Sequence, residues 1–378
     1  MSKKTLLFII ADRPSQLAAK GEITRRYYNP GDHFDHVHIL TTTNDRIDPQ
    51  VIAATAGRAE LSVHSLWNSS DRANMLFSPV LHRRWGKKAV ALAQRVGVDV
   101  VRTGDRLTGY LGSLIKEELG VPHILSLHTH RDDSIAHMPW GMHRLFMEYE
   151  KRYARRAIAA ADAVIIVYES LRDHAQTYGA RRIELIYNVI SPELSAAKQD
   201  YSLHGMGRMI TVGRQLARKL PDQIIRAMAE VEAELTVVGD GDAHQYLEQV
   251  SREAQVAERV NFEKSLPNRD LCRRIVDFDG FVAHTQYPEF PKTIMEALWL
   301  GVPVIVNDCQ SRTVPEMAGD WLVRVANSPE GYGEAMRMIL GDEELRRDLG
   351  VRGRRYAEET FDPSRAEAQA AELYAEFS

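Results

Sequence analysis

The sequence has little cysteine and no long apolar run. Its two cysteines, Cys272 and Cys309, cannot form the disulfide framework of a small secreted domain, so a reducing cytosolic compartment is expected. The apolar run near the N-terminus, in TLLFIIADRP, is interrupted at Asp12 and predicts a first β-strand in place of a signal peptide. No segment approaches the roughly 18 apolar residues that indicate a membrane-spanning helix.

A strong excess of either charge is also absent. The 48 Lys and Arg residues against 52 Asp and Glu residues give a net charge of −4, which favours neither nucleic acid nor an anionic membrane as a general partner. The hydrophobic fraction of 44% and the charged fraction of 26% are those of an ordinary soluble globular protein. A chain of 378 residues is longer than one core usually supports, so two domains are expected.

Short apolar runs alternate with segments whose apolar residues recur every three or four positions. The runs that predict strands are TLLFII, HVHILT, VDVVRT, HILSLH, DAVIIVY and IELIYN, then MITVG, ELTVVG, RVNFE, GFVAHT, VPVIV and WLVRV. Such runs, separated by helices, indicate parallel sheets buried on both faces. The series occurs twice, around a segment without periodicity at 191–207, which predicts a first domain over 1–190 and a second over 208–360. Ligands of such sheets bind beyond the carboxyl ends of the strands, so we expect the site in a cleft between the domains.

Two motifs in the second half suit a phosphorylated ligand. In ITVGRQLARKLPD a predicted strand ends at Gly213, and Arg214 and Lys219 follow on a loop, where they could hold a diphosphate or be two surface cations. VVGDGD predicts a tight turn after another strand, which alone is a weak signal.

The second motif is YPEFPKTIMEALWLGVPVIV, residues 287–306. Pro291 suits the first position of a helix, and the amides of Lys292, Thr293 and Ile294 would then form an anion-binding end. Glu296, one turn further, could accept hydrogen bonds from a ribose diol, and Glu289 in the preceding loop would face the next group, a sugar. The alternative is a capping carboxylate and a solvent-facing helical glutamate.

Four blocks, VGRQLARKLPD, LTVVGDGD, PEFPKTIMEALWLGVPVIVND and VPEMAG, resemble in order and spacing the donor domain of retaining glycosyltransferases of family four. In the first half GVPHILSLHTH and ADAVIIVYESLRDHAQTYGARRIELIYN are similar to the family's acceptor domain. The resemblance implies the GT-B fold, which has two doubly wound Rossmann-like domains facing across a cleft. It also implies that residues 361–378 form a closing helix that crosses back to the first domain.

The resemblance also implies roles for individual positions. Those that match the family's diphosphate-binding residues are Gly21, Gly213, Arg214, Lys219, Thr293 and Ile294. Glu296 matches the ribose-binding glutamate, and His128 matches a histidine near the donor sugar. Gly21 and Glu22 fall where the family's first loop enters its helix. Family members retain the anomeric configuration and need neither metal nor cofactor beyond the sugar nucleotide; a leaving phosphate oxygen is thought to take the acceptor proton.

Three departures concern the sugar contacts. The family's first glutamate should lie eight residues before Glu296, but that position is Pro288, and we expect Glu289 to act in its place. The usual Gly-Gly of the first loop is reduced to Gly21. The family's NGVD is NVIS here, beginning at Asn188.

Two other features leave alternatives open. HTHRDDSIAH contains His128, His130, Asp132, Asp133 and His137, which could bind a metal, line the acceptor cleft or be plain surface. The basic amphipathic segment 143–160 could contact the inner surface of a membrane or be a solvated face.

The expected function is transfer of a hexose-type sugar from a nucleoside-diphosphate sugar, UDP being preferred over GDP by a small margin. The acceptor would be a glycan, a lipid-linked molecule or a small molecule. The alternatives are a GT-B sugar-nucleotide epimerase and a catalytically weak subunit that binds sugar nucleotides.

Overall fold

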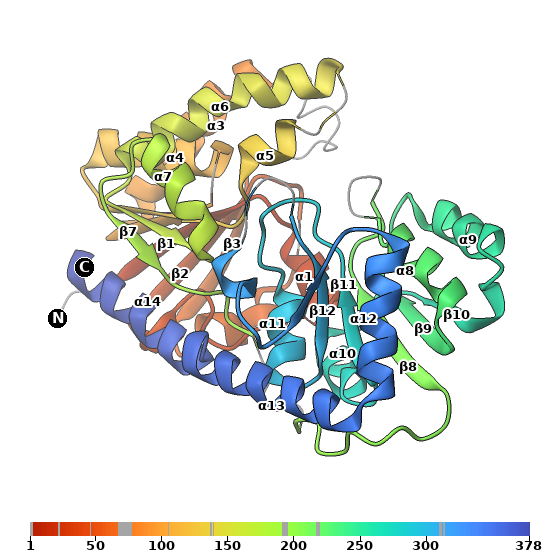
Figure 1. The fold of residues 1–378 in the computed structure, drawn as a ribbon. Coiled ribbons are helices and arrows are strands. Elements are labelled where there is room, and N and C mark those ends of the chain that lie inside the picture. Colours follow the sequence, from red (N-terminus) through yellow and green to blue (C-terminus); the bar gives the residue numbers. More distant parts are fainter. Residues whose placement is uncertain are drawn as a thin grey trace. The chain divides into compact units, whose positions relative to one another are not determined.

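The computed structural model describes residues 3–21, 23–45, 47–66, 78–104, 106–136, 138, 140–190, 196–216, 220–309, 312 and 314–378 (Figure 1). The chain divides into two compact units. Unit 1 comprises Met1–Val189 and Pro363–Ser378, and unit 2 comprises Ile190–Asp362.

Unit 1 is built on a seven-stranded sheet in the order β3-β2-β1-β4-β5-β6-β7, and all its strand pairs are parallel. The strands are β1 (Thr5–Ile10), β2 (His36–Thr41), β3 (Glu60–Ser65), β4 (Val100–Thr103), β5 (His123–Leu127), β6 (Ala163–Ile166) and β7 (Ile183–Leu185). The predicted strands are all present. One observed strand, β3, was not predicted. It is an edge strand with half-buried residues, so the sequence shows no apolar run there.

Helices cover both faces of this sheet. Leu7 and Ile9 of β1 face α3 (Ser78–Val96) and α4 (Arg106–Leu119), whereas Leu6 and Phe8 face η2 (Pro49–Ala56) and α14 (Pro363–Phe377). The remaining helices of unit 1 are η1 (Pro30–Asp32), α1 (Pro14–Ala19), α5 (Arg131–Ala136), α6 (Met142–Ala160), η3 (Glu169–Leu171) and α7 (Arg172–Thr177).

Helix α14 returns the end of the chain to unit 1. Ala366, Ala370, Leu373 and Tyr374 recur every three or four residues, so they share one face, and that face is buried in the core of unit 1. Figure 1 shows α14 lying along the sheet of this unit. The closing helix of the predicted fold is therefore present.

Unit 2 has a six-stranded parallel sheet in the order β10-β9-β8-β11-β12-β13. Its strands are β8 (Gly207–Val212), β9 (Ala233–Val238), β10 (Val260–Glu263), β11 (Gly280–Ala283), β12 (Val304–Asn307) and β13 (Val323–Val325). Its longer helices are α8 (Asp222–Ala227), α9 (His244–Glu253), α10 (Asn268–Ile275), α11 (Lys292–Trp299), α12 (Pro329–Gly341) and α13 (Glu343–Thr360), with short turns η5 (Met228–Glu230), η6 (Ala257–Arg259) and η7 (Pro315–Met317). Each of the six strands coincides with a predicted apolar run.

The described part of the segment at 191–207 packs on unit 2. The Tyr201 hydroxyl donates to the Gly301 carbonyl at 2.8 Å, and the buried guanidinium of Arg346 donates to the Tyr201 carbonyl at 2.8 Å. These bonds anchor the segment although it lacks regular structure before β8.

Candidate functional site

Several of the predicted residues, namely Gly213, Arg214, Glu289 and His128, lie in loops that follow strands at the carboxyl edge of the two sheets. In unit 2, β8 pairs with both β9 and β11, so the loops after Val212, Val238 and Ala283 leave neighbouring strands. In a parallel sheet these ends lie on one edge, where ligands bind. The geometry therefore places the two predicted phosphate-binding motifs on adjacent loops.

Glycines in VVGDGD allow the loops after β8 and β9 to touch backbone to backbone. A Cβ on Gly239 would lie 1.9 Å from the Gly213 carbonyl oxygen, and one on Gly241 would lie 2.0 Å from that of Gln215. Buried Gln215 joins the loops, because its Nε2 donates to the Gly239 carbonyl at 2.9 Å and its Oε1 lies 2.7 Å from His244 Nδ1. Gln215 was not predicted from the sequence as a residue of the site, although its position next to Arg214 could have indicated it.

Gly213 itself has space around it. A Cβ there would meet nothing within 4 Å, so the packing of unit 2 does not require glycine at this position. The adjacent side chain of Arg214 is exposed. Lys219, the second predicted cation, lies outside the described residues.

Helix α11 begins one residue later than predicted. Pro291 has an extended conformation (φ −65°, ψ 140°) and is the N-cap, so Lys292 is the first helical residue. The Ile294 amide donates to the Pro291 carbonyl at 3.0 Å, in a tight first turn. The expectation that this amide is free to bind an anion is therefore wrong. The helix has no side-chain cap, which leaves the amides of Lys292 and Thr293 at its positive end.

Glu296 is a buried carboxylate, with 2% of its surface exposed. Its Oε1 accepts a hydrogen bond from Asn268 Nδ2 at 2.8 Å, at the start of α10. Burial, followed by the charge of Glu296, raises the pKa of the neighbouring Cys272 thiol to about 12. The solvent-facing alternative for Glu296 is therefore wrong. Asn268 was missed in the sequence, where only its position at a helix start was visible.

The loop that carries Glu289 starts from a rigid base. Asn307 Oδ1 accepts from the Thr285 amide at 2.8 Å and from the Tyr332 hydroxyl at 3.1 Å, and its Nδ2 donates to the Thr285 carbonyl at 2.8 Å. These buried bonds fix the chain where it leaves β11. Glu289 lies four residues after Thr285 and is half-buried.

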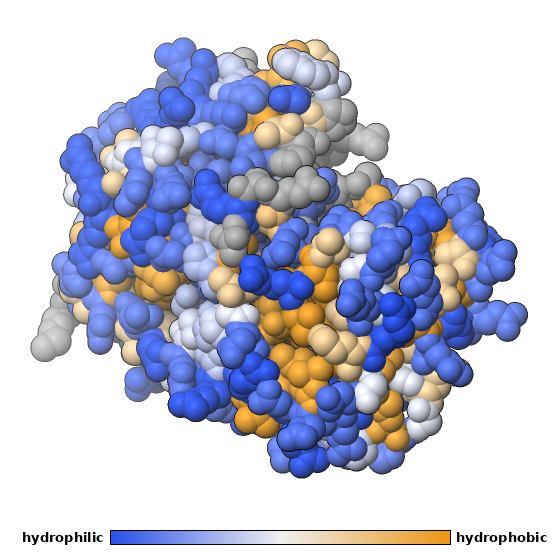
Figure 2. Space-filling view, in the orientation of Figure 1, coloured by the Kyte–Doolittle hydropathy of each residue, from blue (hydrophilic) through white to orange (hydrophobic). Residues whose placement is uncertain are grey.

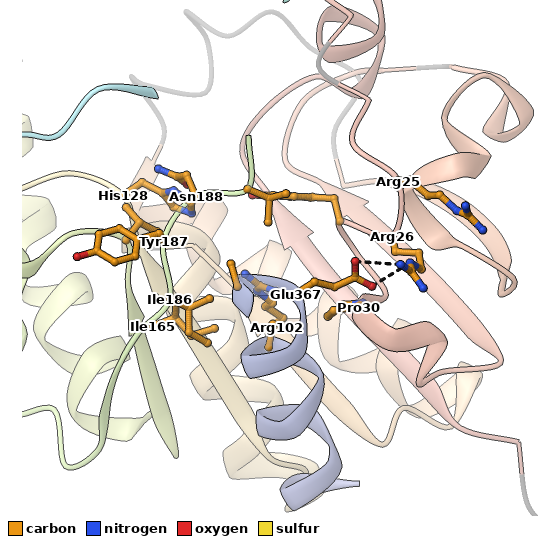
Figure 3. A pocket seen from close by; sticks show the side chains of 15 residues that line it. Arg25, Arg26, Pro30, Arg102, His128, Ile165, Ile186, Tyr187, Asn188 and Glu367 are labelled. Carbon is orange, nitrogen blue, oxygen red and sulfur yellow. Dashed lines mark hydrogen bonds and ion pairs between the residues drawn. The ribbon is translucent and has the colours of Figure 1, made fainter. Parts of the chain in front are cut away.

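In unit 1, His128 follows β5 and lines a pocket at the carboxyl edge of the sheet (Figure 3). The pocket lies between the strand ends and α14. Its lining combines apolar residues with polar ones, of which the charged side chains are Arg25, Arg26, Arg102 and Glu367. Figure 3 shows Arg26 pointing at Glu367, with Arg102 beneath.

Gly21 does not lead into a helix. It has a left-handed conformation (φ 67°), and its amide donates to the Ala18 carbonyl at 3.0 Å, so it ends α1. The reason is that Pro14 starts this helix earlier, at its first position. Glu22 lies outside the described residues.

The segment after His128 is held by internal ion pairs. Asp132 accepts from the Tyr178 hydroxyl at 2.9 Å and from Lys151 Nζ at 3.1 Å, and His174 Nδ1 lies 3.6 Å away. The contact with His174 contributes most to holding the pKa of Asp132 far below its usual range. Within the described residues no group of three or more His, Cys, Asp or Glu side chains is arranged to hold a metal ion. His137 lies outside them.

Comparison with known proteins agrees with this geometry. Residues 200–356 match the family described as "Glycosyl transferases group 1", and residues 35–194 match "Glycosyltransferase Family 4". The chain is 26% identical over 312 residues to alpha-maltose-1-phosphate synthase of Mycolicibacterium smegmatis, which covers 74% of this chain and 79% of that protein.

Two solved structures share the fold. Sucrose-phosphate synthase from Thermosynechococcus elongatus superposes with a TM-score of 0.76 at 18% identity, covering 99% of both chains. Anabaena HepE in complex with UDP-glucose gives a TM-score of 0.74 at 16% identity, covering 98% of this chain and 99% of that one. With two parallel sheets and a returning C-terminal helix, the fold is GT-B. The chain is a glycosyltransferase and belongs to glycosyltransferase family four.

Proposed function

We propose that the protein transfers a hexose-type sugar from a nucleoside-diphosphate sugar to an acceptor hydroxyl, with retention of the anomeric configuration. The observation that carries this proposal is the buried carboxylate of Glu296, one turn inside a helix whose first amides have no side-chain cap. A carboxylate held 2.8 Å from Asn268 is pre-positioned for a ribose diol, and the helix end beside it suits phosphate.

The transfer step separates charge, because the sugar leaves a diphosphate. The amides of Lys292 and Thr293, together with Arg214 and Lys219, would stabilise the charge on the leaving phosphate. One of its oxygens would take the acceptor proton, so that no metal or cofactor is needed. Glu289 and His128 would contact the sugar. UDP is our first choice of nucleotide, which the complex of HepE with UDP-glucose supports.

A screen of UDP, GDP, ADP and dTDP sugars by thermal shift tests the donor. A ligand at 100 times its dissociation constant adds about 2.7 kcal/mol of stability. We expect slow release of nucleotide from the preferred donor without acceptor, insensitivity of this reaction to EDTA, and an unchanged anomeric configuration in the product by NMR. Epimerised donor would establish the epimerase alternative, and binding without any turnover would establish a binding subunit.

Contact with a membrane remains part of the proposal for the acceptor side. In the described part of the chain, no helix has the length and apolarity to cross a bilayer. At the start of α6, however, Trp140 and Met142 are each 80% exposed, and Arg144 lies 4.6 Å over the Trp140 ring. Figure 2 shows apolar atoms over this helix on a largely hydrophilic face. Trp140→Ala should reduce co-sedimentation with anionic vesicles; equal sedimentation of both proteins would exclude this contact.

A further inference from the structure

The pocket of unit 1 contains a buried cation whose partners, among the residues that the structure describes, are neutral groups. Arg102, at the end of β4, is 8% exposed. Its Nε donates to Ser126 Oγ at 3.2 Å and its Nη1 donates to the Tyr374 hydroxyl at 2.8 Å. The Phe8 ring lies 5.0 Å from the guanidinium carbon. In the part of the chain that the structure describes, no carboxylate forms an ion pair with Arg102.

Such an arrangement is costly unless an anion completes it. A buried charge loses its hydration, and hydroxyl groups and aromatic rings restore only part of what water provided. A guanidinium has five N–H donors in a planar fork that matches the oxygens of a carboxylate or phosphate. Two of these donors are used by Ser126 and Tyr374, and the residue lines a pocket that is open to a ligand.

The other charges in the pocket leave a positive surplus. Glu367, the acidic residue of the lining, is already paired with Arg26, at 2.8 Å from Nε and 3.0 Å from Nη2. It also accepts from the Gly31 amide at 3.1 Å. Arg25 is exposed at the rim and forms no ion pair within the described residues. Within the described residues Arg102 is therefore a buried cation without an acidic partner beside one neutralised pair, and Arg25 adds positive charge at the rim, where its side chain points away from Arg102 (Figure 3).

We propose that this pocket binds an anionic group, a carboxylate or a phosphate, on the acceptor, and that Arg102 is the residue that selects it. The inference rests on the proposed function and narrows the acceptor to a molecule that carries such a group. The Asn188 side chain, which also lines the pocket, supplies neutral hydrogen bonds to the same ligand. The apolar side chains of Ile165 and Ile186 bound the pocket and keep its dielectric low.

Matched acceptors test the proposal with the intact protein. Glucose, glucose 6-phosphate and glucuronate would be compared as acceptors with the donor found in the thermal-shift screen. We expect kcat/KM to be at least tenfold higher for an anionic member, and Arg102→Met to bring the ratio close to one. Tyr374→Phe is the matched control, since it removes the bond to α14 but keeps the guanidinium, and it should preserve the ratio.

Binding of inorganic phosphate gives a second readout that does not depend on turnover. At constant ionic strength, phosphate should stabilise the wild type and the Tyr374→Phe variant against heat but not Arg102→Met. Because Arg102 is buried and its variant could fold poorly, Arg25→Gln at the exposed rim should independently weaken the effect of phosphate several-fold.

The outcomes separate this inference from the proposed function. Donor turnover with no preference between neutral and anionic acceptors, and no effect of phosphate, would overturn the inference alone. A loss of UDP affinity in Arg102→Met, measured by calorimetry, would assign the anion to the sugar donor and also overturn it. Absence of both nucleotide binding and donor turnover in the wild type would overturn the proposed function itself.

Discussion

The two units share one architecture but organise polar groups at the edge of the sheet in different ways. In unit 2 the loops after β8 and β9 meet through backbone atoms, and Gly239 and Gly241 allow that contact. In unit 1 the corresponding edge is built from side chains, including buried Arg102 and its partners Ser126 and Tyr374. The loops of unit 2 therefore depend on close backbone packing, whereas the edge of unit 1 depends on hydrogen bonds between buried side chains.

The largest effect is expected where the backbone contact in unit 2 is broken. Gly239→Ala would place a Cβ 1.9 Å from the Gly213 carbonyl, at a φ of 146°, and should destabilise the protein by roughly 2–4 kcal/mol. Urea denaturation measures this loss. Gly213→Ala is the control, since its Cβ has no neighbour within 4 Å; it should unfold within about 0.5 kcal/mol of the wild type and change nucleotide binding only. Equal stability of all three proteins would remove the steric reason for glycine at position 239.

The ribose contact should produce the next largest effect. Glu296→Gln keeps the shape of the buried side chain but removes its charge, and should weaken UDP binding by about 1.5–3 kcal/mol. Pyrophosphate binding should stay unchanged, because in the proposed site the helix amides and Arg214 hold that group. Calorimetry with both ligands checks this. A parallel loss for UDP and pyrophosphate would show that Glu296 positions the phosphate site and does not contact ribose.

Glu289 should act on the sugar and not on the nucleotide. Glu289→Ala should lower kcat/KM for the sugar donor, by a loss of roughly 2 kcal/mol in transition-state stabilisation. It should also narrow the preference between donor epimers, because the wrong epimer leaves the Glu289 carboxylate unpaired in the wild type. UDP affinity should remain that of the wild type, in contrast to Glu296→Gln. Wild-type selectivity in the variant would reduce Glu289 to a loop charge.

The sequence predicted regular elements better than contacts between them. The parallel strands follow from apolar runs, and the helix that carries Glu296 follows from Pro291 and the apolar residues after it, since both depend on local pattern. Arg102, Asn268 and Asn307 were missed because their roles depend on partners distant in sequence, such as Tyr374, which lies 272 residues after Arg102. The start of α11 was shifted by one residue, since a proline suits both the N-cap and the first helical position.

The smallest expected effect is a difference between the two units in how their stability depends on pH. Burial, followed by the charge of Lys116, lowers the pKa of His123 in unit 1 to about 3, and burial lowers that of His82 to about 4. Unfolding restores both to about 6.5, so the unfolded state binds more protons below that pH. The stability that the neutral rings contribute is therefore complete above pH 6.5 and is lost as pH falls toward the folded values.

For His123 alone this loss should be about 1 kcal/mol between pH 6.5 and 5.5. In unit 2 the shifted group is an acid. The hydrogen bond from Arg274 lowers the pKa of Glu263 from 4.5, so the stability that this carboxylate contributes is lost only as pH falls below about that value. Urea denaturation at pH 7.0 and 5.5 should therefore show that the protein is less stable at the lower pH. His123→Leu should reduce this loss of stability, and His204→Ala, an exposed change in unit 2, should leave it intact. If His123→Leu kept the full pH dependence, other groups would be responsible, and the units would not differ through this buried histidine.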